Sequence, residues 1–220
     1  MTIKKHLDDM ISLLKEDVSF MADLALAHLK EALNAFKNHD VDLAKQVIEK
    51  DDLVDALEEK LAKQALKIIW KEQPVASDLR FVTGVLKLIT DIERIGDHAS
   101  DIASMTLHLE KNLNQSVLPI TTKMSMIVEE MVLSSIKALI QTDLLLAKEV
   151  IKKDDLVDDL FKQLINKMTL EIKHDKIDAN ELIYVLMVAK YFERVGDHAV
   201  NIAEWIIFIV KGTHKNTSLF

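Results

Sequence analysis

The feature that most constrains this chain is an internal repeat. Residues 50–55 (KDDLVD) recur letter for letter at 153–158, and residues 93–99 (ERIGDHA) recur at 193–199 with one change, isoleucine to valine. The first motif returns after 103 residues and the second after 100, so their order and nearly their spacing are kept. Two such matches indicate a tandem duplication of a unit of roughly one hundred residues.

Composition restricts each unit to helices. The 220 residues include only 4 Gly and 2 Pro, too few for the tight turns of a sandwich, a barrel or a dinucleotide-binding fold. Hydrophobic residues make up 49%, enough for a sizeable core. The absence of Cys excludes disulfides and zinc–thiolate sites.

Each unit is predicted to hold three long helices, packed as an antiparallel three-helix bundle. Asp40 is a predicted N-cap, and Gln73-Pro74 ends a helix because a proline disfavours helix in the residue before it. The predicted helices cover residues 2–37, 40–72, 75–111, 119–141 and 143–174, with a last helix that opens at 178. The fold prediction is therefore all-α, with units at 1–112 and 119–211, a linker between them and a flexible tail at 212–220.

Acidic residues four positions apart recur on the second and third helix of each unit. At about 100° per residue, both members of each pair lie at the edge of the apolar face of their helix, which we call the acidic shoulder. The two groups of four are Asp51, Asp55, Glu93 and Asp97, and Asp154, Asp158, Glu193 and Asp197. Asp101 follows on the same shoulder of the first unit, whereas Asn201 replaces it in the second.

If the two shoulders of a bundle face each other, four carboxylates converge. Like charges 4 Å apart repel by about 4 kcal/mol at an effective dielectric of 20, so such a group needs protons, arginines or cations. All-oxygen sites favour hard or borderline ions such as magnesium, manganese, calcium or iron. The alternative is an ordinary solvated acidic face, and the residues alone leave both readings open.

Two glycines and two arginines belong to the repeated motif. Gly96 and Gly196 lie mid-helix, where glycine costs about 1 kcal/mol against alanine, so a close approach of a helix or ligand is expected there, or simply tight packing. Arg94 and Arg194 lie where they could neutralise the acidic residues, or they belong to the surface.

The two histidines of the motif and a tryptophan that follows it are predicted to face water. His98 falls among charged residues on the helical wheel, and His198 repeats its position. Trp205 falls on the polar side of its helix and is expected to be exposed. No nucleophilic triad, P-loop, dinucleotide fingerprint or Glu-x-x-His pair is present, so no enzymatic activity is predicted.

Residues 73–80 (QPVASDLR) and 91–99 (DIERIGDHA), with the KDDLVD segment and the tandem layout, closely resemble the PhoU family of bacterial phosphate-uptake regulators. The resemblance extends over the whole chain up to about residue 211. It implies two three-helix bundles, a homodimer and no enzymatic activity. It also implies a metal, divalent or multinuclear (iron, manganese, zinc or magnesium), on the eight carboxylates named above.

The resemblance further implies the partners. PhoU proteins link the phosphate ABC transporter to the phosphate-sensing histidine kinase and repress the phosphate-starvation response when phosphate is plentiful. The second half has Asn201 and lacks a PVASDLR equivalent, reading KIDANE at 176–181, so its cluster is expected to hold fewer metals or a different one.

Charge and hydropathy indicate the partners and the cellular location of the protein. The formal net charge of −8 argues against nucleic-acid binding, which needs a basic face. The chain shows no signal peptide and no apolar run near the ~20 residues that span a bilayer, so a cytoplasmic protein is expected, with peripheral membrane association through partners.

Two other functions compete with the metal-binding regulator. The first is a metal-free helical scaffold whose acidic shoulders dock basic partner surfaces. The second is a carboxylate-bridged metalloenzyme, which the missing histidine ligands disfavour.

Overall fold

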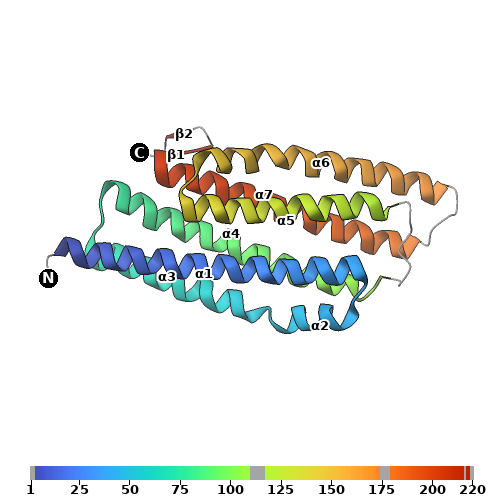
Figure 1. Ribbon diagram of the computed structural model, residues 1–220, viewed down its shortest axis with the longest axis horizontal. Helices are drawn as coiled ribbons and strands as arrows, with labels where there is room; N and C mark the ends of the chain where they lie inside the picture. Colours follow the sequence, from blue (N-terminus) through green and yellow to red (C-terminus); the bar gives the residue numbers. More distant parts are fainter. Residues whose placement is uncertain (1–2, 110–116, 174–178, 216, 219–220) are drawn as a thin grey trace.

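The computed structural model describes residues 3–109, 117–173, 179–215 and 217–218, and nearly all of them lie in helices (Figure 1). The elements are α1 Ile3–Asn38, α2 Val41–Glu49, α3 Asp52–Glu72, α4 Ala76–Thr106, α5 Leu118–Gln141, α6 Leu144–Lys173, α7 Ala179–Lys211, β1 Thr213–His214 and β2 Thr217–Ser218. Helices α1 to α4 pack as one bundle and α5 to α7 as the other. The predicted all-α tandem of three-helix bundles is confirmed, except that the second helix of the first bundle is in two pieces.

The two bundles pack against each other along α4 and α7, the third helix of each (Figure 1). At Gly84 a Cβ would lie 2.5 Å from Cγ1 of Ile209, so glycine lets α4 approach α7 closely there. Phe36 of α1 meets Phe192 of α7 edge to face, with ring centroids 5.5 Å apart. Both rings are fully buried, and burial of aromatic surface is a large favourable term in such a contact.

The helix predicted over residues 40–72 is interrupted at Lys50 and Asp51. The Lys50 N–H bonds to the Val47 carbonyl at 3.1 Å and the Leu53 N–H to the Lys50 carbonyl at 3.2 Å, the three-residue spacing of a tightened turn. In the second half the same KDDLVD letters lie inside the uninterrupted α6. The hexapeptide therefore does not break a helix by itself, and tertiary contacts decide the outcome.

Other helix ends follow local sequence signals. The Asp40 side chain accepts a hydrogen bond from the Leu43 N–H at 3.0 Å, which confirms the predicted N-cap. α3 ends at Gln73 in the left-handed conformation, directly before Pro74. The linker expected at 112–119 and the predicted capping residue Asp178 lie largely or wholly outside the described residues.

The tail forms a short hairpin that the sequence analysis did not anticipate. β1 and β2 pair antiparallel, with Thr213 opposite Ser218 and His214 opposite Thr217. The His214 ring stacks on Trp205 with centroids 4.0 Å apart, so Trp205 is half-buried and not exposed as predicted. None of the described helices is long and apolar enough to cross a membrane.

Candidate metal centres

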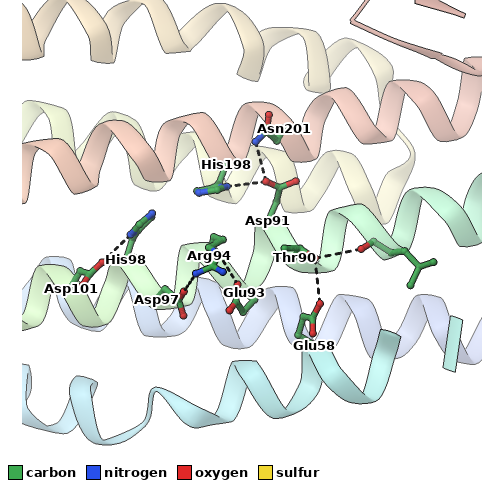
Figure 2. A network of polar contacts seen from close by, with 11 residues as sticks. Glu58, Thr90, Asp91, Glu93, Arg94, Asp97, His98, Asp101, His198 and Asn201 are labelled. Carbon is green, nitrogen blue, oxygen red and sulfur yellow. Dashed lines mark hydrogen bonds and ion pairs between the residues drawn. The ribbon is translucent and has the colours of Figure 1, made fainter. Parts of the chain in front are cut away.

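Three of the predicted carboxylates converge where α3 faces α4. Asp55, Glu93 and Asp97 each place one carboxylate oxygen within 4.8 Å of the other two. Asp55 is exposed, whereas Glu93 and Asp97 are half-buried. Figure 2 shows Glu93 and Asp97 side by side on α4, which their i, i+4 spacing produces. This triad is the one group of its kind among residues 3–109, 117–173, 179–215 and 217–218.

Arg94 partly neutralises this triad. Its Nη1 donates to Asp97 Oδ2 at 2.6 Å, and its Nε lies 3.3 Å from Glu93 Oε2 (Figure 2). The second contact is close enough for an ion pair but lacks hydrogen-bond geometry, so Glu93 Oε2 is buried without a hydrogen-bond partner. A buried carboxylate oxygen without a donor is costly, and a cation or a proton would relieve that cost.

Two members of the triad have raised pKa values. Burial, with the charge of Asp97 second, raises the pKa of Glu93 to about 7, although Arg94 opposes the shift. The pKa of Asp55 is also raised, first by burial and then by the charge of Asp97. Glu93 and Asp55 therefore do not ionise easily in the protein alone.

The fourth predicted carboxylate of the first group lies elsewhere. Asp51 Oδ1 accepts a hydrogen bond from the Ser100 hydroxyl at 2.6 Å. His28 Nε2 lies 3.2 Å from the same hydroxyl, and both His28 and Ser100 are buried. Sequence analysis missed His28 and Ser100, because neither belongs to a motif that both halves share.

The second group is arranged differently. Asp154 Oδ1 would lie only 3.2 Å from a Cβ at Gly196, so the missing side chain makes room for this carboxylate on α7. Burial, followed by the charges of Asp197 and Asp158, raises the pKa of Asp154 to about 6. The pKa of Asp197 is raised too, first by burial and then by Glu193. The ion-pair partner of Glu193 is Lys190, whereas Arg194, the counterpart of Arg94, is exposed and forms no ion pair with a described residue.

The prediction that the two motif histidines face water is wrong, because His98 is buried and His198 is half-buried. His98 is 7% exposed, and burial lowers its pKa although Asp101 opposes the shift. The polar side of α4 is covered by α7 of the other bundle, which a helical wheel of one helix does not reveal. The recurrence of the histidine in both halves was the available signal.

The histidines belong to a polar network between the bundles (Figure 2). His98 Nδ1 lies 3.1 Å from Asp101 Oδ2, and His198 Nδ1 lies 2.9 Å from Asp91 Oδ1. Asn201 donates its Nδ2 to the same Asp91 oxygen at 3.0 Å. Asp101 is thus engaged with His98 and lies outside the triad, so Asn201 at the equivalent position does not remove a triad carboxylate.

Comparison with known proteins gives consistent matches. A family model described as the PhoU domain matches residues 18–106 and 121–206, once in each repeat. The chain is 33% identical over 193 residues to the phosphate-specific transport system accessory protein PhoU homolog of Clostridium acetobutylicum, covering 87% of this chain and 88% of that protein. It is 37% identical over 180 residues to the homolog of the same name from Aquifex aeolicus, covering 82% and 81%. The crystal structure of PhoU from Pseudomonas aeruginosa matches with a TM-score of 0.89 and 29% identity, covering 94% of this chain and 99% of that chain.

Proposed function

This chain belongs to the PhoU family, and from that membership we propose that it is an accessory protein that regulates phosphate uptake through a phosphate-specific transport system. The relatives from Clostridium acetobutylicum and Aquifex aeolicus are named as accessory proteins of such a system. The match includes both repeats and most of the length of each relative. The family is one of regulatory accessory proteins and not of enzymes.

The finer role that we propose is negative regulation. A homodimer in the cytoplasm links the phosphate ABC transporter to its sensor histidine kinase and represses the phosphate-starvation response when phosphate is plentiful. The family resemblance supports these partners, and any contact with the membrane goes through the transporter.

Deleting the gene tests the regulatory role. We expect phosphate-starvation genes to be derepressed in phosphate-rich medium, and the full chain supplied from a plasmid to restore repression. Unchanged transcript levels in the deletion strain, measured in parallel with a transporter deletion, would contradict the proposal.

The proposal includes a cation on the first acidic group. The observation that carries it is the convergence of Asp55, Glu93 and Asp97 around a buried Glu93 oxygen that lacks a hydrogen-bond donor. Three carboxylates are suitable ligands for a hard or borderline cation such as magnesium, manganese, iron or zinc. The positive charge would let the three carboxylates ionise together, and the exposed Asp55 leaves a path to solvent. Asp154, Asp158, Glu193 and Asp197 form the proposed second site, with Asp51 beside the first.

Arg94 supports the competing candidate, a metal-free scaffold. It already contacts two members of the triad and so neutralises part of their charge without a metal. In this candidate Asp55 and the other exposed acidic residues of α3 make the contact.

Metal content decides between the two candidates. The protein is purified without chelators and its metal is measured by elemental analysis. A Glu93→Gln/Asp97→Asn/Glu193→Gln/Asp197→Asn variant is compared with Glu59→Gln/Asp159→Asn, whose acidic residues are exposed and pair with lysines on their own helices. Stoichiometric metal in the wild type and the control, with a lower metal content in the quadruple variant, supports the sites. Equal metal in all three proteins, or none in the wild type, supports the scaffold.

A further inference from the structure

Two histidines from different bundles face each other in the interface between α4 and α7. The ring centroids of His98 and His198 lie 5.5 Å apart (Figure 2). They occupy the same position in the two copies of the ERxGDHA motif, so the duplication brings equivalent side chains together across the interface. Neither residue belongs to the acidic groups described above.

The hydrogen bonds of the two rings fix their tautomer. A carboxylate can only accept, so the Nδ1–H of His98 donates to Asp101 and the Nδ1–H of His198 donates to Asp91. In the neutral ring the proton on Nδ1 leaves the lone pair on Nε2 free. Neither Nε2 takes part in a hydrogen bond with any residue in the described part of the chain. In Figure 2 the edges of the two rings that turn away from the aspartates are directed toward each other.

This arrangement is typical of metal-binding histidines. A histidine that binds metal through one nitrogen generally donates the other N–H to a carboxylate, which orients the ring and raises its basicity. Here both rings have that carboxylate partner, and a third polar group, Asn201, holds Asp91 in place. Imidazole nitrogen suits zinc, nickel, copper and cobalt, whereas the oxygen-only triad suits harder ions.

We infer that His98 and His198 form a second kind of cation site, which binds a borderline divalent ion such as Zn²⁺ through both Nε2 atoms and so joins the two bundles. Asp91 and Asp101 lie behind the rings and offset the charge of the ion. Water completes the coordination, since no third protein ligand converges with the two imidazoles among the described residues. The site is independent of the proposed cation on the acidic triad.

Zn²⁺ titration measures the site directly. The Glu93→Gln/Asp97→Asn/Glu193→Gln/Asp197→Asn chain lacks four of the eight competing carboxylates and serves as the parent for isothermal titration calorimetry. We expect one equivalent of Zn²⁺ to bind the parent, and this equivalent to be lost on adding His98→Ala or His198→Ala. His108→Ala is the matched control, because His108 is an exposed histidine near the end of α4 that stacks on Tyr184.

Further variants separate metal binding from structural effects. His198→Gln keeps a donor toward Asp91 in a folded chain and is expected to abolish the same equivalent. Asp91→Asn leaves both imidazoles in place and is expected to weaken Zn²⁺ binding by about 10- to 100-fold. Zn²⁺ should also raise the melting temperature of the parent and of the His108→Ala chain, reversibly with chelator, but not that of the His198→Gln chain.

Two outcomes would overturn the inference. One is Zn²⁺ binding to the His198→Gln chain with the affinity and stoichiometry of the parent. The other is a parent that binds no Zn²⁺, or one whose Zn²⁺ binding is lost entirely when His108→Ala is added.

Discussion

The two repeats carry the same KDDLVD letters, yet they place the first aspartate after the lysine in different environments. In the first repeat the helix breaks at Asp51, whose carboxylate accepts a hydrogen bond from Ser100 beside the buried His28. In the second repeat α6 continues, and Asp154 lies over Gly196 among other carboxylates. The repeated motif therefore supplies the acidic residues, while residues outside the motif decide which of them face one another.

The acidic groups of the two repeats also differ in the basic residues that neutralise them. The first group has three converging carboxylates and Arg94 across two of them. In the second group Lys190 pairs with Glu193, Arg194 is exposed, and the pKa of Asp154 is raised to about 6. A duplicated acidic motif has thus become two acidic groups with different charge balance, and a substitution in one repeat should differ in effect from its counterpart in the other.

Removing the Ser100 hydroxyl should have the largest effect. In Ser100→Ala, Asp51 and the buried His28 both lose their partner, and a buried polar group left unsatisfied costs about 1–3 kcal/mol. The free energy of unfolding, measured by urea denaturation, should fall by this amount. Ser125→Ala is the control, because the buried Ser125 hydroxyl donates to a carbonyl of its own helix, that of Thr122. Equal losses in the two variants would show that the contact to Asp51 is not special.

Glu93→Gln should remove a pH dependence that belongs to the first repeat. The native pKa of Glu93 is about 7 against 4.5 in the unfolded chain, so between these values the native protein holds a proton that the unfolded chain releases. The stability of the metal-free protein therefore falls as pH rises through this window. Allowing for partial solvent exposure, we expect Glu93→Gln to gain about 1–2 kcal/mol at pH 8 and nothing at pH 4.

That prediction is measured by urea denaturation between pH 4 and 8 in the presence of chelator. Glu59→Gln serves as the control, because Glu59 is exposed and pairs with Lys63 on its own helix. A stability profile of Glu93→Gln that runs parallel to that of the wild type would contradict the raised pKa. In the wild type, a bound cation should abolish the decline, since it stabilises the ionised carboxylates.

Asp154→Asn should act in the same direction but at lower pH and more weakly. The native pKa of about 6 against 3.8 in the unfolded chain places its pH window below that of Glu93, which runs from 4.5 to about 7, and the Asp154 side chain is partly exposed. We expect a gain of about 1 kcal/mol above pH 6 in metal-free protein, with no change at pH 3.5. Asp159→Asn, an exposed residue on the same helix, is the control. If the windows of Asp154→Asn and Glu93→Gln coincide, the two repeats are electrostatically equivalent and the comparison fails.

The sequence was sufficient for the fold because the duplication, the capping residue Asp40 and the proline after Gln73 are local signals. It predicted that acidic residues of two facing helices converge, which holds for Asp55, Glu93 and Asp97, but it also placed Asp51 in that group, whereas Asp51 contacts Ser100. It was insufficient for the helix break at Asp51 and for the burial of His98, because Ser100 and the α4–α7 contact act from other elements. A helical wheel treats each helix alone, whereas here the polar side of α4 is itself an interface.

The two motif arginines allow the smallest and most direct comparison. Arg94 contacts Asp97 at 2.6 Å and Glu93 at 3.3 Å but is half exposed, and exposed ion pairs contribute about 0–1 kcal/mol. Arg94→Gln should therefore cost about 0.5–1 kcal/mol at pH 8, where the carboxylates are ionised, and less at pH 4. Arg194→Gln should change stability by less than about 0.5 kcal/mol at either pH, because Arg194 has no such pair in the described structure. Urea denaturation of both variants at both pH values measures the difference, and equal effects would mean that Arg94 does not neutralise the first group.

Because Arg94 lowers the pKa of Glu93, its removal should also make the stability of the protein more sensitive to pH, which a purely structural role would not do.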